Sequence, residues 1–175
     1  MKNIYFIRGE ITAIVLNRQD GSTLETLIDT VDLEKAKSFP NTWCAAKYPS
    51  SDALYCYGAI RHDGKQTNIK LHRWLTGCGP ALLVDHYDNN PLNNTRSNLR
   101  LVNHSGNLQN RTGPCKNNTC GVRGVWWSKR KSRWVAEAKV DKRTVYCSLF
   151  VNLEDATRAV EEARRTLMPY SKEAS

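Results

Sequence analysis

The strongest constraint on the fold comes from residues 83–111, where two short apolar segments enclose a long polar loop. The flanking segments, LLVD and NLRLV, have the apolar character and length of short strands. The loop between them, YDNNPLNNTRSN, is rich in asparagine and has only Leu92 as a packing residue. HSGNLQNR then has the composition of a short helix, with Ser105 as a candidate N-cap. The region is therefore predicted to form a strand–loop–strand–helix (ββα) unit.

The predicted unit carries three polar residues suited to chemistry on a phosphodiester. Asp85 and His86 lie at the end of the first strand, and Asn107 lies on the helix. A neutral histidine can take a proton from water near neutral pH. Carboxylate and amide oxygens are hard ligands of the kind Mg²⁺ accepts while keeping several non-protein ligands. An isolated Asp-His pair is more often a surface turn, so the hypothesis depends on the joint pattern.

That joint pattern, VDHYDNNPLNNTRSNLRLVNHSGNLQN, resembles the HNH or ββα-metal endonucleases, especially the group common in phage genomes and group I introns. The resemblance implies that Asp85 and Asn107 bind a divalent metal, Mg²⁺ first and Mn²⁺ as a substitute. It also implies that His86 is the general base and that Asn98 takes the middle position, which braces the His and the loop. Asn stands at the last position, where many relatives have His, and this departs from a zinc-type ligand set.

The β-like N-terminal part and the LHRWLTG segment also fit this group of endonucleases. LHRWLTG is predicted to be a helix or helical turn ending at Gly77, and Asp29 to Phe39 a short helix stopped by Pro40. Arg73 is a candidate phosphate contact or a solvated helix residue, whereas His72 is interpreted as structural. The strands predicted before this helix cover residues 3–8, 11–17, 41–48, 53–61 and 66–71.

A second pattern covers residues 120–168, where three alternating segments precede a helical one. The segments are GVRGVWW, SRWVAEAKV and RTVYCSLF, and the helix that follows is predicted to have Asn152 as its cap. One sheet face is predicted to be small and apolar and to receive the helix, leaving the opposite, charged face in solvent. The helix stripe that covers the sheet is predicted to be Ala156, Val160, Ala163 and Leu167.

GVRGVWW, RWVAEAKV and SLFVNLEDATRAVEEA resemble the AP2 domain, a three-stranded sheet plus helix known from plant transcription factors and phage endonucleases. The family lays its sheet in the major groove, so the resemblance implies double-stranded DNA as partner. Trp126 stands where plant members usually have Arg, so their base preference is not transferred. The candidate DNA-binding residues are Arg123, Trp126, Lys129, Arg130, Arg133, Glu137, Lys139, Arg143, Thr144 and Tyr146, with Arg73 and Arg111 outside this domain.

The charge distribution supports a polyanionic partner. Residues 111–147 contain 10 basic and 2 acidic side chains, and the whole chain has a net charge of +9. An anionic membrane surface is the weaker alternative, because the basic segment alternates like strands and does not form an amphipathic helix. Cys115 and Cys120 have a looser spacing than most zinc knuckles, so reduced thiols are the better expectation.

The sequence thus predicts an α+β protein with two modules. Residues 1–111 form the HNH domain, with a β-rich part (1–70) and the core (71–111); 112–119 are a linker; 120–170 are AP2-like. The expected function is site-specific, metal-dependent DNA cleavage of the homing type, in which a monomer would nick one strand and a homodimer could cut both. The alternatives are a dimeric restriction-type enzyme making double-strand cuts and a regulator with an inactive nuclease unit. The absence of a signal-peptide pattern predicts a cytoplasmic protein without a membrane partner. The resemblance to the phage endonucleases implies that it is phage-encoded.

Overall fold

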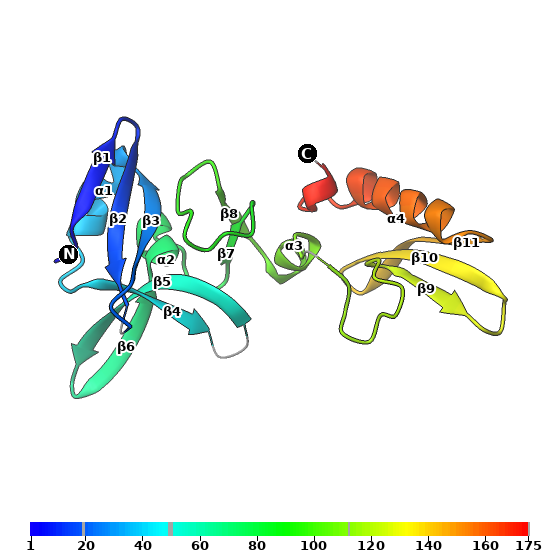
Figure 1. Ribbon diagram of the computed structural model, residues 1–175, viewed down its shortest axis with the longest axis horizontal. Coiled ribbons are helices and arrows are strands. Elements are labelled where there is room, and N and C mark those ends of the chain that lie inside the picture. Colours follow the sequence, from blue (N-terminus) through cyan, green and yellow to red (C-terminus); the bar gives the residue numbers. More distant parts are fainter. Residues whose placement is uncertain (19, 49–50, 112, 175) are drawn as a thin grey trace. The chain divides into compact units, whose positions relative to one another are not determined.

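The computed structural model describes residues 1–174 except 19, 49, 50 and 112. The architecture is mixed α+β, with most residues of regular structure in small antiparallel sheets and few helices (Figure 1), which confirms the expected class. The chain divides into two compact units, Met1–Leu101 and Val102–Ser175. The predicted linker begins with residue 112, which lies outside the described residues.

The N-terminal unit begins with a three-stranded antiparallel sheet in the order β1-β2-β3. Its strands are β1 (Tyr5–Arg8), β2 (Ile11–Asn17) and β3 (Thr23–Asp29). Gly9 has a φ of +66° in the tight β1–β2 turn, a conformation that favours glycine. The third strand was not predicted, because TLETLID carries a charge among its apolar residues and has no turn residue directly after it.

A short helical segment and a second sheet follow. The segment consists of the 3-10 turn η1 (Thr30–Asp32) and α1 (Leu33–Lys37), which ends before Pro40 as predicted. The sheet has the order β4-β5-β6, formed by Trp43–Tyr48, Ser51–His62 and Lys65–Lys70. Helix α2 (Leu71–Thr76) comes directly after β6 and ends at Gly77, whose φ of +65° gives a left-handed C-cap.

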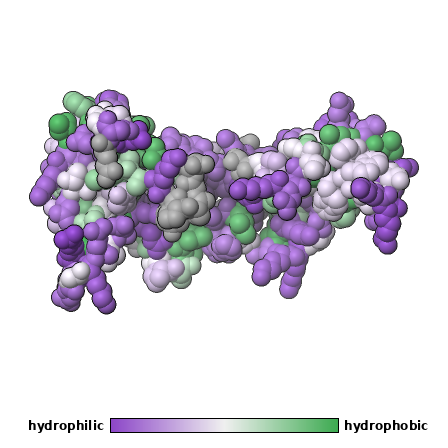
Figure 2. Space-filling model, turned by 60° about the horizontal axis from the view of Figure 1, so that its bottom comes forward, coloured by the Kyte–Doolittle hydropathy of each residue, from purple (hydrophilic) through white to green (hydrophobic). Residues whose placement is uncertain are grey.

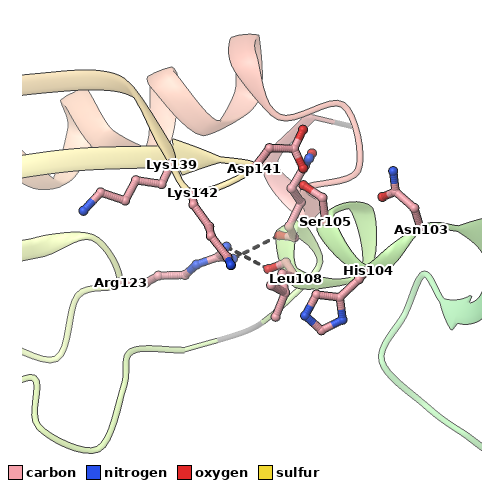
Figure 3. A pocket seen from close by; sticks show the side chains of 9 residues that line it. Asn103, His104, Ser105, Leu108, Arg123, Lys139, Asp141 and Lys142 are labelled. Carbon is pink, nitrogen blue, oxygen red and sulfur yellow. Dashed lines mark hydrogen bonds between the residues drawn. The ribbon is translucent and has the colours of Figure 1, made fainter.

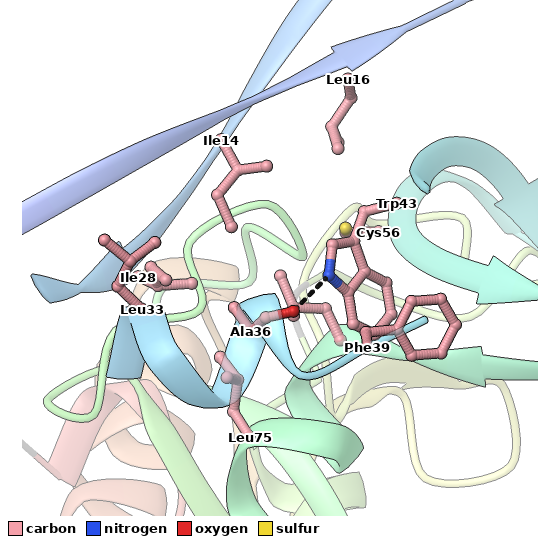
Figure 4. Packing of buried hydrophobic residues seen from close by; sticks show 10 residues of the cluster. Ile14, Leu16, Ile28, Leu33, Ala36, Phe39, Trp43, Cys56 and Leu75 are labelled. Carbon is pink, nitrogen blue, oxygen red and sulfur yellow. Dashed lines mark hydrogen bonds between the residues drawn. The ribbon is translucent and has the colours of Figure 1, made fainter. Parts of the chain in front are cut away.

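The core of this unit lies between the first sheet, α1, α2 and the second sheet. Phe39 and Trp43 stack with ring centroids 4.0 Å apart, and Trp43 Nε1 donates a hydrogen bond to the Ala36 carbonyl (Figure 4). Gly58 is required beside them, because a Cβ there would lie 2.2 Å from the Phe39 ring. The other buried members of this core are Ile14, Leu16, Ile28, Leu33, Cys56, Leu71 and Leu75.

The predicted ββα region contains its three elements. Strands β7 (Leu83–His86) and β8 (Leu99–Val102) form a two-stranded sheet, and α3 (His104–Gln109) follows. The predicted cap was wrong by two residues. Asn103, not Ser105, is the N-cap, and its side chain accepts a hydrogen bond from the Gly106 amide at 2.8 Å.

The C-terminal unit contains the three-stranded sheet and long helix predicted from residues 120–168. The sheet has the order β9-β10-β11, formed by Val125–Ser128, Arg133–Val140 and Arg143–Phe150. Helix α4 (Leu153–Leu167) covers one face, and η2 (Lys172–Ala174) follows it. Asn152 holds the N-cap position with extended backbone, although its side chain bonds to Asp155 and not to a backbone amide.

The small apolar residues of β10 face α4 as expected. Ala136, Ala138, Ala156, Val160 and Ala163 are buried between sheet and helix. The predicted helix stripe was wrong at its end, because Leu167 is 42% exposed and Met168 fills the core instead. The apolar side chain that closes the core at this end is therefore that of Met168, the residue after α4, and not that of Leu167.

Figure 2 shows hydrophilic side chains over most of the face in view, with apolar side chains in small separate patches. No helix among the described residues is long and apolar enough to cross a membrane.

Candidate functional site

Asp85 and His86 end strand β7, and both are buried, at 7% and 6% exposure. The chain turns away directly after them, where the Tyr87 amide donates to the Asn98 carbonyl at 2.9 Å. The two side chains have different partners. Asp85 contacts β8, whereas His86 contacts the long loop and α2. The site is therefore built around two adjacent residues with separate supports.

The carboxylate of Asp85 forms an ion pair with a residue that the sequence did not single out. Arg100 Nη2 lies 2.7 Å from Asp85 Oδ2, and the Arg100 guanidinium lies over the Tyr87 ring at 4.8 Å from its centroid. The pair is largely buried, with side-chain exposures of 23% for Arg100 and 8% for Asp85. A cation thus neutralises this carboxylate in the structure, and a metal ion at Asp85 would compete with it.

His86 is held by an asparagine of the loop. Its Nε2 lies 3.2 Å from Asn94 Oδ1, and Asn94 is 1% exposed. Burial lowers the pKa of His86 below its usual value, while the Asn94 hydrogen bond and the nearby Asp88 and Asp85 charges oppose that shift. The imidazole is therefore neutral at neutral pH, which is the form that a general base needs.

His72 on α2 packs against His86, which agrees with the structural role expected for it. Their ring centroids lie 5.0 Å apart at 73°, and Tyr55 packs edge-on to both rings. Burial lowers the pKa of His72 to about 3, with smaller contributions from His86, Lys70 and Arg73. A second neutral imidazole and an aromatic ring thus cover His86 on this side.

Asn98, expected at the middle position, binds the loop rather than His86. Its Nδ2 donates to Asp88 Oδ1 at 2.8 Å and to the Asn93 carbonyl at 2.7 Å, and its Oδ1 accepts from the Asp88 amide at 2.8 Å. Burial opposes the ionisation of Asp88, but hydrogen bonds from Asn90, Asn93 and Asn98 outweigh it and lower its pKa. The asparagine-rich loop is therefore a dense network centred on Asp88.

The loop is also fastened to strand β3. The Leu27 amide donates to the Leu92 carbonyl at 2.8 Å, and the Asn94 amide donates to the Leu27 carbonyl at 2.7 Å. Thr26 Oγ1 donates to the Leu92 carbonyl and accepts from Asn94 Nδ2, both at 2.8 Å. Neither Thr26 nor Asn94 was identified from sequence, because only the pairing of distant segments makes them neighbours.

Asn107, the remaining predicted ligand, lies on α3 and belongs to the C-terminal unit. The described residues contain no group of three or more His, Cys, Asp and Glu side chains that could hold a metal ion. The donor chemistry of the predicted pair still fits a hard cation. Mg²⁺ is commonly held by one or two protein oxygens together with water and phosphate oxygens.

The face of the C-terminal sheet opposite α4 combines apolar and polar residues. Trp126, Val135 and Leu149 are cross-strand neighbours on this face, and Trp126 and Leu149 are each 43% exposed. Beside them, Glu137 accepts from Thr144 Oγ1 at 2.9 Å and pairs with Lys139 Nζ at 2.8 Å. Four of the predicted DNA contacts, Trp126, Glu137, Lys139 and Thr144, therefore share one open face.

Tyr146, which was also expected to contact DNA, does not lie on that face. It pairs with Ala138 and packs against the core under α4. The reason is an irregularity in the β10–β11 register between Ala138 and Lys139, which shifts the alternation by one residue. After Thr144, the side chains of β11 that face outward are therefore Val145, Cys147 and Leu149.

Arg123 also differs from its expected position on the open face. Its guanidinium donates to the Leu108 carbonyl at 3.1 Å and to the Gln109 carbonyl at 3.0 Å (Figure 3). It also donates to the Arg111 carbonyl. Burial and the nearby Arg164 lower its pKa. Arg123 thus caps the C-terminal end of α3, where backbone carbonyls lack helical partners.

The remaining predicted contacts are arginines and lysines in varied settings. Arg73 donates to the carbonyls of Cys78, Gly79 and Leu82, so its guanidinium braces the loop after α2. Arg133 donates to the Ser132 carbonyl at 2.8 Å from an exposed position. The exposed positions also include Arg111, Lys129, Arg130 and Arg143.

The C-terminal unit also contains a pocket of about 560 Å³ beside α3. Side chains of α3 and of the β10–β11 turn line it. Figure 3 shows that Arg123, just before β9, extends to the C-terminal end of α3. The polar residues of its lining are Asn103, His104, Ser105, Gln109, Arg123, Lys139, Asp141 and Lys142.

Comparison with known proteins finds a partial similarity in sequence to a phage protein. No protein-family model matches the chain, and no solved structure matches it significantly. The chain is 41% identical to Protein 3.8 of Escherichia phage T7 over 64 residues. This match covers 35% of the chain and 52% of the phage protein, so the chain spans about half the length of this relative. Part of the chain is therefore similar to a phage protein.

Proposed function

We propose that the chain is a metal-dependent DNA endonuclease of the HNH type, with His86 as general base. The observation that carries the proposal is the buried, neutral imidazole of His86, which follows the carboxylate of Asp85 directly and is held by Asn94. The partial similarity to a phage protein is compatible with a phage origin.

In this proposal, His86 takes a proton from the attacking water, and the buried surroundings keep the ring neutral and ready to accept it. Asp85 holds the metal, with Asn107 as the second ligand that the sequence pattern implies. A bound Mg²⁺ or Mn²⁺ would neutralise charge on the phosphate and stabilise the leaving oxygen. Asn98 keeps the loop around Asp88 in place.

The sheet face opposite α4 is proposed to bind duplex DNA through the residues it exposes. Trp126 and Leu149 supply apolar contact, while Lys139 and the exposed cations Arg133 and Arg143 supply charge. Phosphate contacts give most of the affinity in such interfaces and position the protein on the duplex. The face is thus proposed to position the duplex, and the HNH unit to cut it.

A plasmid-nicking assay with Mg²⁺, followed by EDTA, tests the activity. We expect His86→Ala to reduce nicking by at least about 100-fold, as for a lost general base, while leaving DNA binding unchanged. His62→Ala is the matched control, because His62 is exposed at the end of β5. Cleavage by His86→Ala at the wild-type rate would refute the general-base role.

One observation favours the inactive regulator as a second candidate. The Asp85–Arg100 ion pair occupies the carboxylate that a metal would need. If the purified chain binds duplex DNA but fails to nick it with either Mg²⁺ or Mn²⁺, the regulator is the better description. Linear product from a single-site plasmid without a nicked intermediate would instead indicate the dimeric, double-strand alternative.

A further inference from the structure

The side-chain amide of Asn94 can take only one orientation. Its Nδ2 donates to Thr26 Oγ1 at 2.8 Å and to the Pro91 carbonyl at 3.3 Å. A flipped amide would place Oδ1 against that carbonyl, and Thr26 Oγ1 already gives its hydrogen to the carbonyl of Leu92. Because both neighbours act as acceptors, the nitrogen must face them, and Oδ1 must face His86.

This orientation determines which ring nitrogen of His86 carries the hydrogen. Asn94 Oδ1 has no hydrogen to give, so the contact with His86 Nε2 at 3.2 Å requires an Nε2–H donor. A neutral imidazole has one hydrogen, and Nδ1 is then the unprotonated nitrogen. The tautomer of His86 is therefore set by an amide eight residues away in the loop.

The anchor of this contact is the first sheet of the N-terminal unit. Thr26 is 0% exposed and Asn94 is 1% exposed, so water does not compete for their hydrogen bonds. The backbone of β3 holds the same loop through Leu27, whose amide and carbonyl bond to Leu92 and Asn94. The position of Asn94 thus depends on β3 rather than on the loop alone.

We propose that Asn94, oriented by Thr26, is a positioning residue that keeps His86 in the Nε2–H form and makes Nδ1 the atom that accepts the proton. The role of His86 as general base rests on the nuclease function proposed above, whereas the assignment of its tautomer does not. If Asn94 only occupied space beside His86, its amide would need no fixed orientation and the tautomer of His86 would be free to vary.

Nitrogen-15 NMR of the histidine rings at about pH 8, where neutral imidazole dominates, reads the tautomer directly. We expect His86 to be Nε2–H in the wild type and in Asn94→Asp, which keeps an acceptor at this position. In Asn94→Leu the Nδ1–H form should become substantially populated. An unchanged tautomer in a folded Asn94→Leu variant, or loss of the Nε2–H form in Asn94→Asp, would overturn the proposal.

Thr26→Val gives a second route that leaves Asn94 in place. Removing the hydroxyl takes away the shorter of the two contacts that orient the amide and leaves only the one to the Pro91 carbonyl, so the Nδ1–H form of His86 should increase. Thr12→Val is the matched control, because Thr12 is equally buried in the same sheet but its hydroxyl bonds to Thr30. Equal tautomer populations in folded Thr26→Val and Thr12→Val would contradict the role of Thr26.

Nicking assays then separate this proposal from the nuclease function. We expect Asn94→Leu to lower kcat by about 10- to 100-fold, the usual effect of removing a partner that orients a functional histidine, with KM unchanged. A shifted tautomer with unchanged kcat would overturn the link to catalysis while leaving the tautomer assignment intact. If His86→Ala cuts normally, the nuclease role of His86 fails, whatever the tautomer.

Discussion

At the scale of single residues, the main finding is that each member of the Asp85–His86 pair has a partner the sequence did not indicate. Arg100 neutralises Asp85, and Asn94 orients His86. Both partners are ordinary polar residues in the chain, separated from their targets by 15 and 8 positions. Their importance arises from burial, because a buried charge or ring nitrogen requires a partner in the fold.

Arg100→Met tests whether Asp85 is a metal ligand. In the wild type a cation must displace the guanidinium, so the variant should bind Mn²⁺ more tightly, by about tenfold or about 1.4 kcal/mol, in an EPR titration. The fold should lose about 1–3 kcal/mol, since a largely buried carboxylate loses its partner. Arg61→Met, an exposed change on β5, is the control. Equal Mn²⁺ affinity in the wild type and Arg100→Met would argue against Asp85 as a ligand.

His72 makes the fold sensitive to acid. Its pKa is about 3 in the folded protein and about 6.5 in the unfolded chain, so the unfolded chain takes up the proton first as pH falls. Stability is therefore complete above about pH 6.5 and falls toward pH 3, by up to about 1.4 kcal/mol per pH unit. Urea unfolding of His72→Phe between pH 7 and 4 should show a shallower loss.

The control for this measurement is His62→Phe, at an exposed position at the end of β5. It should follow the wild-type pH dependence. If His72→Phe and the wild type lost stability in parallel over this range, burial of His72 would not be the source of the acid sensitivity.

At the scale of elements, the helix α3 is tied to its own unit by side chains from later in the chain. Arg123 caps its C-terminal carbonyls, and Gln109 Oε1 accepts from the Tyr170 amide at 3.2 Å. Gly106 lies against Tyr170, where a Cβ would come within 3.0 Å of the ring. A six-residue helix has little stability of its own, so these contacts hold it in place.

Arg123→Ala should therefore affect mainly stability, and Arg133→Ala mainly DNA binding. Loss of the Arg123 hydrogen bonds should destabilise the C-terminal unit by about 1–3 kcal/mol, because each bond involves a charged donor. Loss of the exposed Arg133 should change stability little and weaken DNA binding. Urea unfolding and fluorescence anisotropy on one duplex measure the two effects. A DNA-binding loss without a stability loss in Arg123→Ala would favour the DNA contact expected from the sequence.

At the scale of the whole molecule, the charge is concentrated in the C-terminal unit. Residues 102–175 contain 14 basic and 7 acidic side chains, against 12 and 10 in residues 1–101. The proposed DNA-binding face lies in the C-terminal unit, and its exposed cations extend to Lys129 and Arg130 in the β9–β10 turn. Affinity for duplex DNA should therefore depend steeply on salt.

The double variant Lys129→Gln/Arg130→Gln should reduce the slope of log Kobs against log salt by up to about 1.8, the release expected for two phosphate contacts. Arg158→Gln/Arg165→Gln removes the same charge from α4, on the other side of the sheet, where both arginines pair with acidic residues. That control should leave the slope nearly unchanged. Equal slopes in both doubles would indicate that net charge, and not the turn, governs binding.

Much of the architecture could be predicted from local sequence. Strands β1, β2, β4, β5 and β6 and helix α2 lie close to the predicted ranges, since alternation, glycine and proline act over a few residues. Strand β3 was missed, and with it the sheet that supports the loop. Tyr146 was expected to contact DNA but lies in the core, because a register irregularity is a property of two paired strands.

The sequence by itself determined the α+β class, the ββα order of elements around Asp85 and His86, and the basic character of the C-terminal unit. These follow from composition and short-range periodicity. Only the tertiary structure decided which side chains hold the site: Arg100 on Asp85, Asn94 and Thr26 on His86, and Arg123 on α3. The physical reason is that buried polar groups take partners from whichever segment the fold brings beside them, and this choice depends on long-range pairing.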